Sequence, residues 1–264
     1  MPLDKDIRRV GLARSLSKLG HCSRSRAVEL IRAGRVKLNG VARRSAECPV
    51  RLDRDQIEVD DQVVRMREFV YVAMNKPRGL VTSASDEKGR KTIYALLEDT
   101  NQSWLAPVGR LDKASEGLLI LTNDSEWGHR LAAPESHLDK TYHVQIDRIA
   151  NSQLIAALEQ GIYDQGEFLR ARRAHILRSG AKNCWLQITL DEGRNRHIRR
   201  MLKSQDAEVL RLVRVAIGPL ELGTLAKGAT RPLSEEEKCA LDEALRAASA
   251  NRTPSLRGRR SKPA

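Results

Sequence analysis

The sequence has few aromatic residues and no long apolar run. Aromatic residues make up 3% of the chain, which excludes an extensive aromatic platform for stacking bases but leaves room for one or two stacking side chains. No apolar stretch approaches the roughly 20 residues that cross a bilayer. The N-terminal segment MPLDKDIRRVG also lacks the apolar core of a signal peptide. We therefore expect a cytoplasmic protein.

Cysteine and histidine do not occur at metal-binding spacings. The four cysteines (Cys22, Cys48, Cys184 and Cys239) lie far apart and form no Cys-x-x-Cys pair, which argues against a zinc site or a disulfide framework. Dinucleotide-binding Gly-x-Gly-x-x-Gly loops and P-loops are absent as well. We expect neither a metal nor a cofactor.

Positive charge is in clear excess. The 264 residues include 47 Lys and Arg against 34 Asp and Glu, giving a formal net charge of +13. Such an excess favours a polyanionic partner, because each neutralised phosphate releases condensed counterions. The length allows one large domain or two unequal ones.

The basic N-terminal region has the pattern of a compact RNA-binding module. Apolar residues at helical spacing from Val10 predict a helix that stops at Gly20, and Ser23 can cap a second helix that closes at Gly34. The alternating segment 35–41 contains Asn-Gly, a strong hairpin signal. A helix pair alone would also fit a DNA-binding regulator, but the hairpin favours RNA. The expected RNA contacts in this region are Arg14, Lys18, Arg24, Arg26, Arg35 and Lys37.

The stretch LGHCSRSRAVELIRAGRVKLNG carries a family resemblance. It resembles the small RNA-binding domain named after ribosomal small-subunit protein S-four. The resemblance covers residues 8–65 and implies an RNA-binding domain there.

The remaining chain predicts alternating strands and helices. Segments 69–74, 140–146 and 185–190 have strand patterns. Asp124 can cap a helix that contains Trp127 and Leu131, and 151–160 is amphipathic at helical spacing. The segment 251–264 carries five Lys or Arg and no acid, so we expect a disordered basic tail that adds non-specific RNA affinity.

A Gly-bounded loop places Arg110 two residues before Asp112, directly ahead of the apolar run 118–121. A carboxylate held beside a guanidinium in such a loop stays ionised even when partly desolvated. Chemistry alone favours the ordinary reading, in which Asp112 is a turn former and Arg110 a solvated surface charge, because most Asp residues in loops form turns.

Two further segments present basic residues in loops. Pro77 and Gly79 predict a tight turn that exposes the cations on either side of Pro77, and 194–200 contains four arginines in seven residues. Such a patch is typical of phosphate contact. The expected RNA contacts here are Lys76, Arg78, Arg194, Arg196 and Arg200.

Several of these segments share a second resemblance. GRLDKASEGLLILTND resembles the catalytic segment of the pseudouridine synthases that modify single uridines in small- or large-subunit ribosomal RNA. NKPRGLVTS, the Lys-x-Tyr run at 140–142, EGRNRHIRRM and LVRVAIGPLELG resemble other motifs of that branch, in matching order. Together with the N-terminal module, the resemblance spans about residues 8–240.

The resemblance implies particular roles for these residues. Asp112 would be the catalytic residue, Tyr142 would lie against the target base, and Ile198 with Arg199 would flank Asp112. We hypothesise that Arg199 pairs with Asp112 and that Tyr142 and Ile198 receive the base on opposite faces. Arg110 would reach the RNA and help to displace the base pair or fill the vacated space. His197 stands where many relatives have Gln, and we assign it no catalytic role.

The implied fold is α+β: a small N-terminal helical and β RNA-binding domain, then a mixed, largely antiparallel-sheet catalytic domain at 69–245. The implied activity is isomerisation of a specific uridine in ribosomal RNA to pseudouridine, by nucleophilic attack or through a glycal. The N-terminal module and the basic C-terminus favour large-subunit RNA. The alternative is a non-catalytic RNA-binding or ribosome-assembly protein, which would not need the carboxylate. We expect a monomer that acts on ribosomal RNA or an assembly intermediate.

Overall fold

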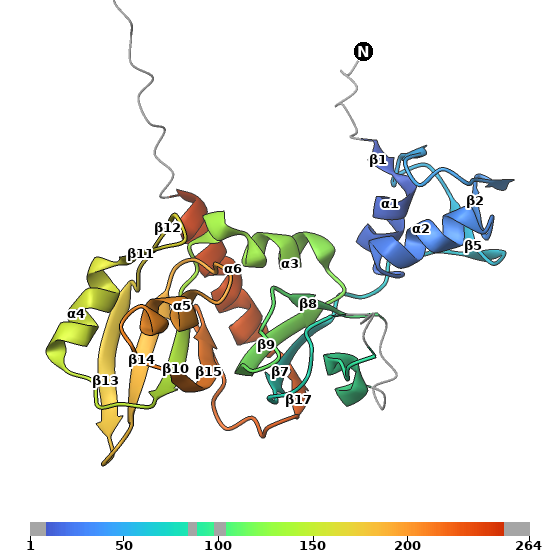
Figure 1. Ribbon diagram of the computed structural model, residues 1–264. Coiled ribbons are helices and arrows are strands. Elements are labelled where there is room, and N and C mark those ends of the chain that lie inside the picture. Colours follow the sequence, from blue (N-terminus) through green and yellow to red (C-terminus); the bar gives the residue numbers. More distant parts are fainter. Residues whose placement is uncertain (1–8, 84–88, 98–103, 251–264) are drawn as a thin grey trace, which may run out of the picture.

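The computed structural model describes residues 9–83, 89–97 and 104–250, and Figure 1 shows a small N-terminal unit beside a larger one. The predicted basic tail at 251–264 lies outside the described residues. In the described part of the chain, no helix is long and apolar enough to cross a membrane.

The small unit packs two helices against short strands. Its elements are β1 (Val10–Gly11), α1 (Leu12–Lys18), α2 (Arg24–Arg32), β2 (Val36–Leu38), β3 (Val41–Ala42), β4 (Pro49–Val50), β5 (Ile57–Val59) and β6 (Gln62–Val63). β2, β3, β5 and β6 form an antiparallel sheet in the order β3-β2-β5-β6, and β1 pairs with β4. Leucine, isoleucine and valine side chains from both helices and the strands fill a single core.

The predicted local signals of this unit are largely confirmed. The Ser23 side chain accepts a hydrogen bond from the Arg26 backbone N–H and caps α2. Asn39 and Gly40 both have positive φ, as a tight two-residue hairpin turn between β2 and β3 requires. The first helix, however, begins at Leu12 and not at Val10, because Val10 pairs with Val50 as a strand.

The large unit is built on a nine-stranded sheet with the order β13-β14-β10-β15-β9-β7-β17, to which β8 and β16 add at β9 and β15. The sheet is antiparallel except between β15 and β9. Its strands are β7 (Tyr71–Lys76), β8 (Ala106–Val108), β9 (Glu116–Thr122), β10 (Lys140–Ile146), β13 (Arg173–Ser179), β14 (Cys184–Leu190), β15 (Val209–Ile217), β16 (Leu220–Glu221) and β17 (Thr230–Pro232).

Helices pack against this sheet and enclose separate hydrophobic cores. α3 and α6 cover β7 and β9, while α4 and α5 cover β10, β13 and β14 (Figure 1). The Asp124 side chain caps α3 as predicted, and Trp127 of α3 donates to Asp242 of α6 at 2.7 Å. These elements are α3 (Ser125–Ala132), α4 (Ser152–Gln160), α5 (His197–Lys203), α6 (Glu235–Ala250), the 3₁₀ turns η1 (Ile93–Leu96) and η2 (Pro134–Ser136), and the hairpin strands β11 (Ile162–Asp164) and β12 (Glu167–Leu169).

The parallel contact between β9 and β15 is very close. It involves only the pairs Val213–Glu116 and Arg214–Gly117. Gly117 has φ +103°, and a Cβ on it would lie 2.2 Å from the Arg214 carbonyl oxygen. Only glycine fits there, and its absence of a side chain lets the loop before β9 approach the middle of β15.

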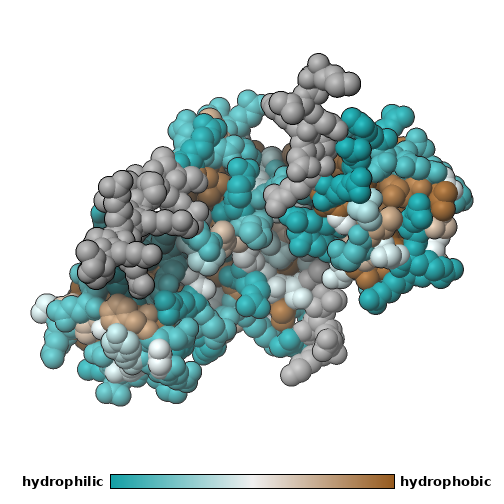
Figure 2. Space-filling model, turned by 90° about the horizontal axis from the view of Figure 1, so that it is seen from above, coloured by the Kyte–Doolittle hydropathy of each residue, from teal (hydrophilic) through white to brown (hydrophobic). Residues whose placement is uncertain are grey.

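The two units are joined by specific contacts. Lys18 of α1 forms an ion pair with Glu126 of α3 at 2.7 Å, and the Arg67 backbone N–H donates to the Leu19 carbonyl at 3.1 Å. Asn123, buried at the end of β9, binds the backbone of Glu68 and Val70 in the connecting segment. Figure 2 shows a mostly hydrophilic face with scattered hydrophobic areas, several of them over the small unit. The predicted α+β architecture is confirmed.

Candidate active site

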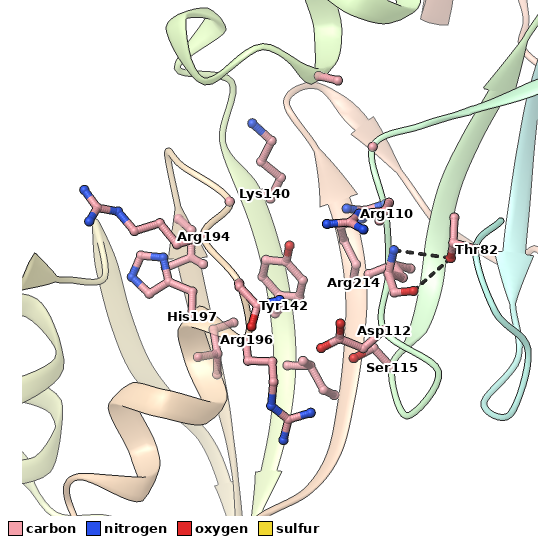
Figure 3. A pocket seen from close by; sticks show the side chains of 18 of the residues that line it. Thr82, Arg110, Asp112, Ser115, Lys140, Tyr142, Arg194, Arg196, His197 and Arg214 are labelled. Carbon is pink, nitrogen blue, oxygen red and sulfur yellow. Dashed lines mark hydrogen bonds between the residues drawn. The ribbon is translucent and has the colours of Figure 1, made fainter. Parts of the chain in front are cut away.

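A cleft of about 690 Å³ opens beside the centre of the large sheet (Figure 3). β10, β15, the loop 109–115 and the segment 193–199 contribute to its wall. Asp112 is the only carboxylate among the described residues that line it. The lining cations are Arg90, Arg110, Lys113, Lys140, Arg194, Arg196, Arg199 and Arg214. Among its described lining residues, the cleft therefore combines one carboxylate with many cationic side chains.

The loop that carries Asp112 is fixed by hydrogen bonds to its backbone. The Thr82 hydroxyl donates to the Leu111 carbonyl at 2.8 Å and accepts from the Leu111 N–H at 3.3 Å. The Gly79 N–H donates to the Lys113 carbonyl at 2.7 Å, and the Ser115 N–H donates to the Asp112 carbonyl at 3.0 Å. These bonds leave the Asp112 side chain directed into the cleft (Figure 3).

Lys76 also holds this loop, and the prediction that it is exposed is wrong. It ends β7 fully buried, and its Nζ donates to the carbonyls of Ser115 at 2.9 Å, Asp112 at 3.1 Å and Pro77 at 3.2 Å. Burial lowers the pKa of Lys76 to about 8, although nearby Asp112 and Glu116 oppose the shift. A buried ammonium with three backbone acceptors supports the loop and is not available to RNA.

Tyr142 lies in the middle of β10 and faces the cleft. Its neighbours across the sheet are Ile188 on β14 and Arg214 on β15. In Figure 3 its ring stands between Asp112 on one side and His197 on the other. The strand thus places an aromatic face within the same cavity as the carboxylate.

Ile198 and Arg199 approach the cleft from the first turn of α5. Ile198 is buried and lines the cavity. Arg199 donates from Nη1 to the Val209 carbonyl at 3.1 Å and from Nη2 to the Ala114 carbonyl at 3.2 Å. Burial lowers the pKa of Arg199, and Asp112 opposes this shift.

The predicted ion pair between Arg199 and Asp112 is not formed within the described residues. The guanidinium instead binds Ala114, two residues beyond Asp112, so it braces the loop through the backbone. The guanidinium is oriented by the Val209 and Ala114 carbonyls and does not reach the Asp112 carboxylate. Arg199 is near Asp112 without contacting its carboxylate.

The remaining predicted basic contacts divide into exposed and internally paired groups. Arg78, Arg110 and Arg196 are exposed. Arg194 pairs with Glu192 at 3.0 Å, and Arg200 pairs with Asp164 and Glu167, both at 2.5 Å. The buried His197 lines the cleft, and burial lowers its pKa.

In the small unit, the predicted RNA contacts also divide into exposed residues and residues with a carboxylate partner. Arg14 and Arg24 are exposed on the helices. The other four each face a carboxylate partner: Lys18 with Glu126, Arg26 with Glu29, Arg35 with Asp60 and Lys37 with Asp61.

Several cleft residues were not among the predicted site residues, and three of them bear directly on the site. Thr82 fixes Leu111, and Lys140 and Arg214 face the cavity beside Tyr142. Lys140 could have been found, because it lies two positions from Tyr142 on a predicted strand and so shares its face. Arg214 lies in the LVRVAIGPLELG motif, but its place beside Tyr142 depends on which strands pair.

Comparison with known proteins identifies the family. Residues 70–204 match the family model described as RNA pseudouridylate synthase, which includes the Asp112 loop, β10 and the start of α5. The chain belongs to the RNA pseudouridine synthase family. Residues 1–57 match the S4 domain, so an S4 domain precedes the synthase domain.

Individual relatives cover nearly the whole chain. A protein of Aquifex aeolicus named as an uncharacterized RNA pseudouridine synthase is 38% identical over 89% of this chain and 95% of its own length. The ribosomal large subunit pseudouridine synthase B of Bacillus subtilis is 37% identical over 86% of this chain and 93% of its own. A crystal structure of a pseudouridylate synthase superposes with a TM-score of 0.63, at 31% identity over 88% of this chain and 99% of that one. The chain is therefore an RNA pseudouridine synthase, an isomerase.

Proposed function

We propose that this enzyme isomerises a specific uridine of ribosomal RNA, favouring the large subunit, with Asp112 as the catalytic residue on a flipped-out base. The observation that supports it best is the position of Asp112. It supplies the only carboxylate among the described residues of a cationic cleft that also contains Tyr142. The printed name of the Bacillus subtilis relative supports the large subunit.

The reaction breaks the bond between uracil N1 and ribose C1′ and forms one between C5 and C1′. In one route a carboxylate oxygen of Asp112 attacks C1′ as uracil leaves, and C5 of the turned base then displaces it. In the other route Asp112 removes the C2′ proton to give a glycal, and returns that proton after C5 adds to C1′. In both, C5 loses a proton and N1 gains one, so atoms and electrons balance without a co-reactant.

Both routes require an ionised Asp112 and a base outside its helical stack. Leaving the stack costs a few kcal/mol, which contacts in the cleft must offset. Tyr142 offers an aromatic face and Ile198 an aliphatic one, so we assign them the opposite sides of the uracil. The exposed Arg110, in the same loop as Asp112, would occupy the space that the base leaves.

Arg199 would stabilise the ionised carboxylate through space and keep its loop in place. The cations Arg78, Arg194 and Arg196 would contact phosphates around the cleft, while the S4 domain would bind RNA farther from the target. Phosphate contacts of this kind position the RNA but carry little sequence information. Arg200, occupied by two carboxylates, would act on RNA only through the β11–β12 hairpin that it anchors.

The test is pseudouridine mapping across both ribosomal RNAs in cells that lack the protein, with rescue by wild type. Loss of one site in the large-subunit RNA, restored by wild type, is the expected result. A lost site in small-subunit RNA would contradict the subunit assignment alone. No change at any ribosomal uridine would contradict the proposed substrate.

The variant Asp112→Asn tests the catalytic residue. It removes the charge while keeping the size of the side chain, so turnover should fall to background while RNA affinity stays within about threefold of wild type. Purified proteins would be compared by tritium release from C5-labelled transcript and by filter binding. The control is Asp206→Asn, at an exposed position with φ +55° that Asn also tolerates. Near wild-type turnover in Asp112→Asn would exclude the proposed role.

A further inference from the structure

Two cations face the cleft on neighbouring strands beside Tyr142. Arg214 on β15 is the cross-strand partner of Tyr142, and Lys140 lies two residues before Tyr142 on β10. Residues two apart on a strand share a face, so all three side chains project from the same side of the sheet. Both cations line the cavity, and Figure 3 shows them above Asp112, with the Tyr142 ring below Lys140 and beside Arg214.

Arg214 has a donor without a protein partner. The side chain is 5% exposed, and its Nε donates to the Leu118 carbonyl at 2.7 Å. Its Nη2 is buried and has no hydrogen-bond partner. A buried guanidinium nitrogen left unpaired is costly, so an acceptor that enters the cleft would be strongly favoured there.

The Lys140 side chain likewise lacks a direct partner among the described residues. It is half-buried and makes no hydrogen bond or ion pair within the described residues. The adjacent carboxylate, Asp139, is already bonded to Arg172 at 2.7 Å. Burial lowers the pKa of Lys140 and the charge of Arg214 lowers it further, while Asp139 and Asp191 oppose the shift. The fold therefore keeps two like charges close together in a partly desolvated wall, and no carboxylate of the described residues is bonded to either of them.

We propose that Lys140 and Arg214 form a subsite for one phosphate that flanks the flipped uridine. This inference rests on the proposed function. A uracil carbonyl is neutral and would satisfy a donor without balancing two cations, whereas RNA carries one negative charge per nucleotide. The phosphates on either side of the target nucleotide are the only anions obliged to accompany it into the cleft.

The subsite differs from the surface arginines in how it is anchored. The Arg214 guanidinium is held by the Leu118 carbonyl and the Lys140 backbone is paired within the sheet, so a phosphate between the two side chains would be held at a defined position. Tyr142 lies beside the two cations on the same face of the sheet, so a phosphate bound between them would place the uracil against the ring and the ribose towards Asp112. The subsite would position the reacting ribose as well as add affinity.

The experiment is a double-mutant cycle between protein and RNA. An oligonucleotide that contains the mapped uridine would carry a neutral methylphosphonate at its 5′ phosphate, and a second one at its 3′ phosphate. With wild-type enzyme, one of the two should lower kcat/KM by roughly 10- to 100-fold, the size of a lost charged contact. With Lys140→Met the same modification should have an effect at least about threefold smaller than in wild type, because one of the two cationic partners is already gone while Arg214 remains.

Controls separate this result from general effects. Lys182→Met removes an exposed lysine in the β13–β14 turn and should keep the full wild-type response to the methylphosphonate. Arg214→Lys keeps the charge and should retain part of the response. Circular dichroism and thermal unfolding would verify that each variant is folded.

Two results would overturn the proposal in distinguishable ways. If the methylphosphonate and Lys140→Met effects multiply independently at both phosphates, the subsite is wrong while the proposed function stands. If mapping finds no ribosomal uridine that depends on this protein, the proposed function fails and the subsite falls with it.

Discussion

The loop that carries Asp112 owes its shape to cationic side chains that bind backbone carbonyls. Lys76 binds the Asp112 and Ser115 carbonyls, and Arg199 binds the Ala114 carbonyl. Charged donors make stronger hydrogen bonds than neutral ones, and both cations also raise the local positive potential. The carboxylate of Asp112 thereby stays free for substrate while the backbone beneath it is fixed.

Replacing Lys76 with Met should damage catalysis more than folding. The apolar side chain removes the cost of burying an ammonium, but it takes away the charged donor to the Ser115 carbonyl and leaves the Asp112 carbonyl with only the Ser115 N–H. We expect kcat to fall by roughly 10-fold or more, since a small misplacement of a reacting group is enough for such a loss.

The measurements for Lys76→Met are single-turnover kinetics and amide hydrogen exchange. Faster exchange at Ser115, whose N–H bonds to the Asp112 carbonyl, should accompany the slower turnover. The matched control is Lys91→Met, an exposed lysine. Wild-type kcat in Lys76→Met would mean that the loop does not need this support.

At the scale of elements, an ion cluster joins β9 to β15 at their short parallel contact. Glu116 is buried and pairs with Arg211 at 2.8 Å and with Lys227 at 2.6 Å. The hydrogen bond from Arg211, followed by that from Lys227, lowers the pKa of Glu116 to about 2. The cluster adjoins Gly117, where the two backbones meet, so it stabilises the junction on which the cleft depends.

This cluster predicts a pH dependence of stability. Because the folded-state pKa of Glu116 is depressed, its stabilising contribution is present above the unfolded value near 4.5 and is lost as the pH falls towards 2. Glu116→Gln should therefore lower the free energy of unfolding at neutral pH, by up to roughly 3 kcal/mol.

Urea unfolding between pH 3 and pH 8 would check this prediction. The difference between wild type and Glu116→Gln should be constant above about pH 5.5 and shrink at lower pH, as linkage requires. Glu29→Gln, which breaks an exposed pair with Arg26, should change stability by less than about 1 kcal/mol. A pH-independent difference for Glu116→Gln would contradict the assignment.

At the scale of the whole molecule, the formal charge of +13 includes five Lys or Arg without any acid at 251–264, in addition to the cations of the S4 domain and the cleft. In the S4 domain, four of the six basic residues predicted to contact RNA have carboxylate partners. The cleft retains the denser excess. Electrostatic attraction should therefore control how RNA binds, while the chemical step depends on the geometry around Asp112.

Salt should accordingly weaken binding and leave the bound reaction largely unchanged. Between about 50 and 200 mM salt we expect RNA affinity to fall by roughly 100-fold or more, with kcat at saturating RNA altered by less than about twofold. Arg196→Gln should reduce the slope of log Kd against log salt by roughly one. Filter binding and turnover would be measured at matched salt, and a salt-independent Kd would refute the electrostatic account.

Local features of this protein follow from its sequence because their causes lie within a few residues. The side chains of Ser23 and Asp124 cap helices by accepting a hydrogen bond from the backbone N–H three residues later in the chain. Asn39 and Gly40 form the turn of a hairpin. The strand periodicity of β10 predicts which side chains share the face of Tyr142. The motif order placed Asp112, Tyr142 and Ile198 in one site, and the cleft contains all three.

Tertiary structure alone decided the partners of the buried cations. From the sequence, Lys76 is expected to be exposed, because it directly precedes the turn at Pro77 and Gly79. In the structure it is buried at the end of β7, and its Nζ donates to three backbone carbonyls. Arg199 was expected to meet the Asp112 carboxylate, but carbonyls on two other segments hold it. The pairing of β15 with β10 placed Arg214 beside Tyr142. Such contacts join residues that lie far apart in the chain. They cannot be predicted from local propensity, because the order of the strands and the close approach of their backbones determine which donor reaches which acceptor.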